Sequence, residues 1–294
     1  MKLTDNARGI LLMCGSMLAF TVNDSFMKAT SQTMPLFQAI ALRGVVSTVA
    51  LLVIARLLTG DLRLMPQGAD GPKVFWRSVA EIASTATFLI ALTQIPLANL
   101  SAIMQSLPLA ITLGAAIFLK EPVGWRRLSA ILIGFCGVLL IVKPGTEGFT
   151  LWSVLGLVSV AFVVLRDLTT RALSRATPSA AVAVWASGAV MAMGVAVATW
   201  QGWVPVSLRE AVYLGIASSA LICGYLFAVM AMRVGDIGLI APFRYTSLLW
   251  AILFGWMLFG TLPDEITVLG AAIVVATGLY TLLRERNLSR RRTG

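Results

Sequence analysis

Four ionisable side chains lie within long apolar stretches of this sequence: Asp24, Arg43, Glu81 and Arg244. An ionised side chain in hydrocarbon costs about 3 kcal/mol or more, so such a residue is usually paired or faces a polar cavity. Helical rise places Asp24 and Arg43 about 8 and 10 Å from one end of their stretches, and Glu81 and Arg244 about 10 and 11 Å from the other. We therefore expect two pairs, Asp24 with Arg43 and Glu81 with Arg244, which either open and close a polar pathway or fix helix packing.

The sequence contains no histidine, which removes the usual proton carrier near neutral pH. If a proton moves, Asp24 or Glu81 must carry it, and we favour Asp24 because Asn23 beside it could orient the carboxylate or hold a substrate. Movement of a solute without a proton fits the sequence equally. The three cysteines lie far apart within apolar runs, which indicates packing residues, neither a disulfide framework nor a metal site. We expect no cofactor and no metal ion.

Two proline-containing stretches are the most polar segments within the apolar runs: residues 105–108 (Gln-Ser-Leu-Pro) and residues 242–247 (Pro-Phe-Arg-Tyr-Thr-Ser). A proline frees backbone carbonyls that a cavity can use, although many membrane helices carry a simple kink. Aromatic side chains near mid-span could stack on a flat ring or face lipid. The candidate substrate-binding residues are Asn23, Gln105, Ser106, Trp185, Tyr225, Phe243, Arg244 and Tyr245.

The elements that carry these residues are membrane spans. The 294 residues are 58% hydrophobic and 12% charged, and their mean hydropathy is +0.88, whereas soluble domains carry roughly a quarter charged residues. A span needs about 20 apolar residues, and we predict an all-α integral membrane protein with ten transmembrane helices. They run near 9–28, 36–58, 74–95, 97–119, 128–142, 150–168, 179–200, 211–232, 237–259 and 266–283.

The basic residues predict the orientation of these spans. Of the 23 Lys and Arg residues, 18 fall on one side of the ten-span arrangement and 3 on the other, with Arg43 and Arg244 inside spans. This bias predicts that both termini are cytoplasmic, and we expect the protein in the cell inner (cytoplasmic) membrane. Residues 284–294 form a predicted basic cytoplasmic tail, and contact with anionic lipid explains it better than nucleic-acid binding.

The chain repeats itself at about half its length. Residues 19–22 (Ala-Phe-Thr-Val) recur as 161–164 (Ala-Phe-Val-Val), and residues 34–35 (Met-Pro) recur as 177–178 (Thr-Pro), at offsets of 142 and 143. Shared apolar composition is the alternative explanation. Because five spans is an odd number, the second half enters the membrane from the opposite side, as in many secondary transporters. We predict two inverted five-helix repeats, residues 9–145 and 150–283.

These motifs resemble those of the drug/metabolite transporter superfamily, in particular its ten-helix branch with two EamA-type repeats. The resemblance rests on residues 19–24 (Ala-Phe-Thr-Val-Asn-Asp), 42–44 (Leu-Arg-Gly) and 119–122 (Leu-Lys-Glu-Pro), and on the run from Gly134 to residues 143–145 (Lys-Pro-Gly). Residues 260–263 (Gly-Thr-Leu-Pro) depart from the usual ending of the second repeat. The resemblance implies a secondary transporter that moves a small polar metabolite by alternating access.

Among its branches, bacterial riboflavin uptake and S-adenosylmethionine uptake look most similar, and we expect uptake of riboflavin or a similar planar metabolite. The alternatives within this fold are a carrier of S-adenosylmethionine, an exporter of amino acids or other metabolites, and a lipid flippase. A membrane enzyme is disfavoured because the sequence lacks zinc and phosphate-binding motifs. Spans 128–142 and 266–283 are rich in small residues that allow close helix contact, within one chain or in a homodimer.

Overall fold

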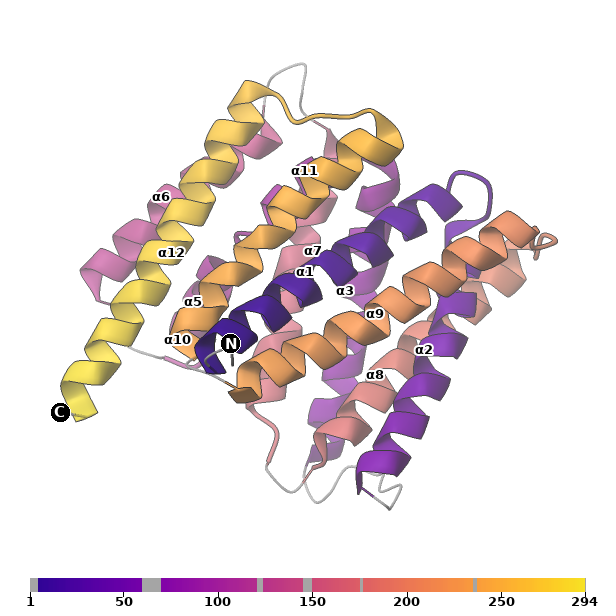
Figure 1. The fold of residues 1–294 in the computed structure, drawn as a ribbon, viewed down its shortest axis with the longest axis horizontal. Helices are drawn as coiled ribbons and strands as arrows, with labels where there is room; N and C mark the ends of the chain where they lie inside the picture. Colours follow the sequence, from indigo (N-terminus) through magenta and orange to yellow (C-terminus); the bar gives the residue numbers. More distant parts are fainter. Residues whose placement is uncertain are drawn as a thin grey trace.

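The computed structural model describes residues 5–59, 70–120, 124–144, 150–174, 177–234 and 237–293, and within these ranges its regular structure is helical (Figure 1). The predicted all-α class is therefore confirmed. The elements are α1 (Asp5–Thr30), α2 (Leu36–Thr59), α3 (Gly71–Gln94), α4 (Leu97–Met104), α5 (Leu107–Phe118), α6 (Trp125–Val142), α7 (Leu151–Arg171), α8 (Ser179–Gln201), α9 (Leu208–Val234), α10 (Ile237–Ile240), the 3₁₀ helix η2 (Ala241–Tyr245), α11 (Thr246–Phe259) and α12 (Glu265–Thr293).

Local sequence explains several helix ends. Pro72 lies in the first turn of α3, where its fixed φ suits a helix and its missing N–H is not needed. The Thr150 hydroxyl accepts a hydrogen bond from the backbone N–H of Ser153 at 3.2 Å and so caps the start of α7. Gly260 ends α11 with φ of 64°, a left-handed conformation that glycine adopts without strain.

All ten predicted spans correspond to helical segments. Nine segments in the described residues are long and apolar enough to cross a membrane, and α4 with α5 form one of them. The tenth span, residues 237–259, is divided into α10, η2 and α11, because Pro242 lacks the N–H that a regular helix needs. The predicted interruptions at the two proline-containing stretches are thus confirmed.

The last predicted span agrees with the structure, and two motifs cannot be compared. The span predicted near 266–283 matches the apolar segment Glu265–Arg284, and its helix continues as α12 to Thr293, since arginine and leucine favour helix beyond the apolar core. Residues 121–123 and 145–149, which include parts of the family-like motifs, lie outside the described residues.

The helix pairs that pack against each other remain the same set when the helices of the first half are exchanged with those of the second. The most extensive contacts join α1 to α9, α3 to α7, α2 to α8 and α6 to α12, and α4 also packs on α11. If α1 is exchanged with α7, α2 with α8, α3 with α9 and α6 with α12, the same set of pairs results. The start of α1 and the end of α12 lie toward the same end of the bundle (Figure 1). We infer from this pattern the two-fold relation that an inverted repeat produces.

Small residues let α6 and α12 approach each other closely, as the sequence predicted for these spans. A Cβ atom on Gly270 would lie 2.5 Å from the Gly137 carbonyl oxygen, and one on Gly137 would lie 2.8 Å from the Gly270 carbonyl oxygen. Both distances are shorter than van der Waals contact. The pair therefore requires glycine on both helices.

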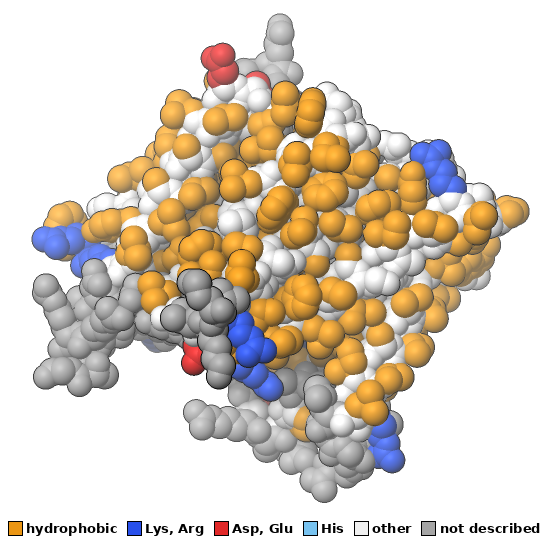
Figure 2. All heavy atoms as spheres, viewed as in Figure 1, with side chains coloured by type: hydrophobic (Ala, Val, Ile, Leu, Met, Phe, Trp, Pro, Cys, Tyr) orange, Lys and Arg blue, Asp and Glu red, His pale blue; other side chains and the backbone are white. Residues whose placement is uncertain are grey.

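The exterior is apolar, as a lipid-facing surface requires. Figure 2 shows hydrophobic side chains spread over the face formed by α1, α9, α11 and α12, with Lys and Arg side chains toward its edges. Large side chains such as Trp200, Leu208 and Phe118 are mostly exposed. A contiguous apolar surface of this size does not suit water. The protein is a multi-pass membrane protein.

Candidate functional site: two polar clusters and an apolar pocket

Asn23, Asp24 and Arg43 form a polar group that we call the α1–α2 cluster. The Asn23 amide nitrogen donates a hydrogen bond to the Asp24 carboxylate at 2.8 Å, and Arg43 Nη1 donates one to the Asn23 amide oxygen at 3.2 Å. Asn23 and Arg43 are 3% and 8% exposed. The sequence predicted that Asp24 and Arg43 meet. They do share a cluster, but the link runs through the Asn23 amide instead of a direct ion pair.

Glu81 lies at the centre of a second group, the α3–α7 cluster of Arg77, Glu81, Arg166, Asp167 and Thr170. Its two carboxylate oxygens lie 3.3 Å from Arg77 Nη2 and 3.3 Å from Arg166 Nη1. Arg166 Nε also donates to Asp167 at 2.9 Å, and Arg77 Nε donates to the Thr170 hydroxyl at 3.0 Å. Each charge in this cluster therefore contacts an opposite charge.

The predicted pair of Glu81 with Arg244 is wrong. Arg244 lies on η2 with an exposed side chain, whereas the ion-pair partners of Glu81 come from α3 itself and from α7. The physical reason is that α3 packs chiefly on α7. Similar depth in the bilayer did not make Glu81 and Arg244 neighbours.

Tyr225 of α9 interacts electrostatically with both clusters: with Glu81, Arg166 and Arg77 of the α3–α7 cluster and with Arg43 of the α1–α2 cluster. Its ring makes an edge-to-face contact with Phe20 of α1, with centroids 5.3 Å apart and planes at 85°. Tyr225 is 47% exposed, so this predicted binding residue is only partly covered by the protein.

The contact between α3 and α7 continues beyond the span at Asp70. The Asp70 carboxylate accepts hydrogen bonds from the Ser174 backbone N–H at 2.9 Å, the Ser174 hydroxyl at 2.6 Å and the Thr177 hydroxyl at 2.7 Å, and Lys73 Nζ lies 3.0 Å away. These donors hold the pKa of the Asp70 carboxyl well below its usual range. Asp70 is therefore a charged anchor between the segment before α3 and the connection after α7.

The two helix breaks contact each other through Gln105. Its amide nitrogen donates to the Ser247 hydroxyl at 2.7 Å and lies 3.5 Å from the Tyr245 carbonyl oxygen. Gln105 is 7% exposed. The neighbouring Ser106 hydroxyl donates to the Ile103 carbonyl oxygen at 2.7 Å, which also accepts the Ser106 backbone N–H at 3.1 Å, so this predicted binding residue is hydrogen-bonded within its own turn.

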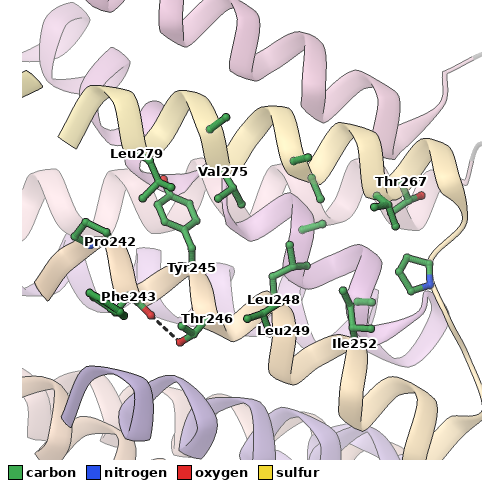
Figure 3. A pocket seen from close by; sticks show the side chains of 17 residues that line it. Pro242, Phe243, Tyr245, Thr246, Leu248, Leu249, Ile252, Thr267, Val275 and Leu279 are labelled. Carbon is green, nitrogen blue, oxygen red and sulfur yellow. Dashed lines mark hydrogen bonds between the residues drawn. The ribbon is translucent and has the colours of Figure 1, made fainter. Parts of the chain in front are cut away.

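An apolar pocket of about 670 Å³ lies between α12 and the η2–α11 segment, with α4 beneath (Figure 3). Phe243 and Tyr245 line it, and the Thr246 hydroxyl donates to the Phe243 carbonyl oxygen at 2.7 Å. Leu249 and Val268 at the pocket are 65% and 48% exposed. A nearly all-apolar wall with such an exposed rim suits hydrocarbon better than a polar metabolite.

The predicted substrate-binding residues are thus divided between separate places. Asn23 and Tyr225 lie with the clusters, Gln105 and Ser106 at the helix break, and Phe243 and Tyr245 at the apolar pocket. Trp185 lies on α8 and is 45% exposed. Within the described ranges, no group of three or more cysteine and acidic side chains is arranged to hold a metal ion.

Sequence reasoning missed Arg77, Arg166 and Lys28 as site residues, because it treated them as charges of the connections. Two signals could have found the arginines: Arg77 precedes Glu81 by one helical turn, and Arg166 falls inside the predicted span 150–168. Lys28 Nζ donates to the carbonyl oxygens of Leu92 and, at 2.6 Å, of Ile95. It therefore satisfies carbonyls at the carboxyl end of α3.

An all-helical bundle with an apolar exterior and charged side chains between its helices belongs to the class of multi-pass membrane proteins in which solutes cross a bilayer. Residues 7–143 match the EamA-like transporter family. This match covers nearly the first half of the chain, so residues 7–143 form an EamA-like transporter domain, and the resemblance to the drug/metabolite transporter superfamily predicted from the motifs is confirmed.

Relatives of known name agree with this assignment. The chain is 25% identical to the pseudopaline exporter CntI of Pseudomonas aeruginosa, over 91% of this chain and 93% of the relative. It is 26% identical to a riboflavin transporter of Rhizobium johnstonii, over 74% and 73%, and 26% identical to an S-adenosylmethionine uptake transporter of Rickettsia conorii, over 68% and 68%. A solved crystal structure with 17% identity covers 93% of this chain and 96% of its own with a TM-score of 0.63, which supports the fold alone.

Proposed function

We propose that this protein is a secondary transporter that moves a small polar metabolite across the cytoplasmic membrane by alternating access. The observation that carries the proposal is that two polar clusters, α1–α2 and α3–α7, lie between the helices of a bundle whose exterior is apolar. Buried charge of this kind marks solute pathways in membrane proteins. Both termini face the cytoplasm in this proposal, which follows from the distribution of Lys and Arg.

The two clusters have different roles in this proposal. Glu81 belongs to the first proposed repeat and Arg166 to the second, so their ion pair joins the two halves. The Glu81–Arg166 ion pair has to separate when the two halves move apart at the cytoplasmic end. We therefore assign it the role of a gate. Asp24 and Arg43 both belong to the first repeat and move together. They therefore suit substrate binding better than the gating role that the sequence suggested for them.

Riboflavin or a similar planar metabolite remains a candidate substrate, because the Phe20 and Tyr225 rings offer an aromatic surface beside polar groups. The names of the relatives include an exporter, an uptake transporter and a riboflavin transporter whose name gives no direction. Both S-adenosylmethionine uptake and metabolite export are therefore second candidates. Counterflow in proteoliposomes measures either direction and is the appropriate assay.

A reversible cross-link tests the gate. In a variant whose three cysteines are replaced by serine, Glu81→Cys with Arg166→Cys places one cysteine on α3 and one on α7. Oxidation or a short thiol cross-linker should abolish saturable counterflow of riboflavin or S-adenosylmethionine, and reduction should restore it. The matched control is Arg77→Cys with Glu81→Cys, which joins two positions of α3, so its oxidised and reduced forms should transport at the same rate. Transport that continues at full rate with the 81–166 link in place would contradict alternating access at this gate.

A further inference from the structure

We propose that the pocket between α12 and the η2–α11 segment holds an acyl chain of a membrane phospholipid as a resident ligand. The proposal goes beyond the transport function, because this lipid stays bound and is not the transported solute. It follows from the way in which small side chains and a divided helix leave an apolar space open within the spanning part of the bundle.

The packing of the neighbouring helices leaves room between α11 and α12. The α12 helix packs chiefly on α6, and α11 packs chiefly on α1 and α4. The pocket of about 670 Å³ lies in the space that remains (Figure 3). Among the described residues, its lining includes no member of either polar cluster. The pocket is therefore separate from the groups assigned to substrate binding and gating.

Small side chains give the pocket its depth. Its floor consists of Ala98 and Ala102 of α4 and Ala271 of α12, and all three are buried. Ala272 and Ala276 continue the lining along α12, four residues apart and therefore on one face of that helix. A larger side chain at any of these positions would take up space that is now open.

The chemistry of the walls favours hydrocarbon. The Thr246 hydroxyl donates to a backbone carbonyl oxygen at 2.7 Å, and the Thr267 hydroxyl donates to Asp264 at 3.1 Å. The Tyr245 hydroxyl lies against Gly278, which is not among the lining residues. An ordered water needs two to four polar partners, and an empty space would lose dispersion contacts along its whole wall. The occupant that satisfies this wall is an apolar chain.

The length of the pocket matches a chain within one leaflet. The pocket begins at the connection between α11 and α12, where Pro263 and Thr267 line it, and follows α12 to Leu279. The rise of the helix from Thr267 to Leu279 is about 18 Å, and one leaflet contributes about half of a hydrocarbon core of about 30 Å. A chain that enters at this connection can leave its headgroup beside the Lys143–Asp264 ion pair.

The pocket is open on the side that faces the bilayer. Leu249 and Val268 line it and are 65% and 48% exposed. Val268 lies in the apolar segment Glu265–Arg284, which is long enough to cross a membrane. Phospholipid is the hydrocarbon that surrounds a spanning segment at this depth. We therefore assign the pocket to one of its acyl chains.

Retention of lipid by the purified full-length protein tests the proposal. The protein is reconstituted in vesicles of dioleoylphosphatidylcholine that include a phosphatidylcholine with a diazirine on one acyl chain, and is then extracted with excess dodecylmaltoside. Native mass spectrometry should show one phospholipid bound per chain. Irradiation after extraction should attach the diazirine to residues 243–252 and 267–279, a readout that needs no variant.

Two variants fill the pocket from different depths. Ala271→Phe places a ring at the floor, and Ala276→Trp places an indole near the opening. Each should reduce the fraction of chains with bound phospholipid at least fivefold. Leu269→Trp is the matched control, because Leu269 lies on the same helix, is 56% exposed and is not among the lining residues. It should retain lipid as the unmodified protein does.

Melting temperatures distinguish a filled pocket from a misfolded variant. The delipidated protein should melt at a higher temperature when dioleoylphosphatidylcholine is added, because a ligand that binds only the folded state stabilises it. A filled variant that still melts cooperatively should gain less than half of this increase, whereas the control variant should gain all of it.

Three results would overturn the proposal: no phospholipid retained by the unmodified protein, equal retention in the filled variants, or labelling spread over distant helices such as α8. A dimer without bound lipid that Ala276→Trp dissociates would also overturn it and assign the pocket to a second copy of the chain. None of these measurements uses counterflow, so the transport proposal stands or fails separately.

Discussion

The α3–α7 and α1–α9 helix pairs, which correspond to each other when the two proposed halves are exchanged, are held together by different chemistry. The α3–α7 pair is joined by ion pairs and hydrogen bonds, from Asp70 at one end through Glu81 to the Ser159 hydroxyl, which donates to the Ser84 carbonyl oxygen at 3.3 Å. The α1–α9 pair is joined chiefly by rings and small residues. Phe20 meets Tyr225 and Phe26 meets Tyr213 edge to face, with centroids 5.3 and 5.1 Å apart.

The difference shows that a repeated fold does not require repeated contacts. Polar contacts can be exchanged for water when two helices separate, because their donors and acceptors remain satisfied in water. Aromatic and glycine contacts lose close packing and gain nothing in exchange. In the proposed transport cycle, the α3–α7 pair is therefore the easier of the two to open and close.

The largest expected effect on stability comes from a change in the α3–α7 helix pair. Glu81→Gln leaves the guanidinium groups of Arg77 and Arg166 without their shared carboxylate, and breaking a buried ion pair in this way costs about 3 kcal/mol. The free energy of unfolding in mixed micelles measures it. Glu265→Gln, which neutralises an exposed carboxylate at the start of α12, is the control. A loss equal to that of the control would mean that α3–α7 does not depend on its charges.

A smaller effect is expected on the aromatic pair. A Cβ atom at Gly224 would lie 2.9 Å from the Phe20 ring, so Gly224→Ala should cost about 1–3 kcal/mol through overpacking. Gly215→Ala lies on the same helix in open space and should be neutral or slightly stabilising, because alanine favours helix. The same unfolding measurement applies. Equal stabilities of the two variants would show that α1–α9 does not require close contact at Gly224.

The contact between the helix breaks should matter less. Ser247→Ala removes the hydroxyl that accepts from the Gln105 amide, and the loss of one such hydrogen bond costs about 1 kcal/mol. Gln105→Ala combined with Ser247→Ala should cost less than the sum of the single changes, which a double-mutant cycle measures. Strict additivity would indicate that the two side chains do not interact in the membrane.

The smallest expected effect is on the stability of the protein at low pH. The folded-state pKa of Asp70 is held below the ordinary value of 3.8, so its stabilising contribution is complete above about pH 4 and declines as the pH falls toward the folded-state pKa. Asp264, whose carboxylate pairs with Lys143, has its pKa lowered to about 2 by that contact and behaves in the same direction. Melting temperatures between pH 3 and 7 should fall below pH 4 less steeply in Asp70→Asn. If the melting temperature falls with pH equally steeply in Asp70→Asn, Asp70 does not contribute to the stability of the α3–α7 pair.

The sequence predicted the features that depend on distance along a helix. The ten spans, the two interruptions at prolines and the close contact of glycine-rich spans are each encoded by local composition and spacing. Depth in the bilayer is also local, because each residue adds about 1.5 Å of rise. These features could be predicted without knowing which helices pack against each other.

Adjacency between helices could not be predicted in the same way. Glu81 and Arg244 were paired by depth, but the direction in which a side chain points around its helix and the identity of the packed neighbour decide the contact, and Arg166 is the actual partner. The hydrogen bond from Asn23 to Asp24 joins sequence neighbours and was predictable, whereas the bond from Arg43 to Asn23 depends on how α1 and α2 are placed. The position of the Tyr245 side chain at the pocket depends on Gly278, where a Cβ atom would lie 1.7 Å from the Tyr245 hydroxyl.

Gln105 and Ser247 are separated by 142 residues, close to the spacing of the proposed repeat, and their side chains are hydrogen-bonded. Two residues that are related by a two-fold axis can contact each other only near that axis. During a rocking motion, points on that axis stay in place while those far from it travel. This hydrogen bond is therefore expected to persist through the whole cycle, as a fixed reference from which the displacement of every other contact can be measured by spectroscopy.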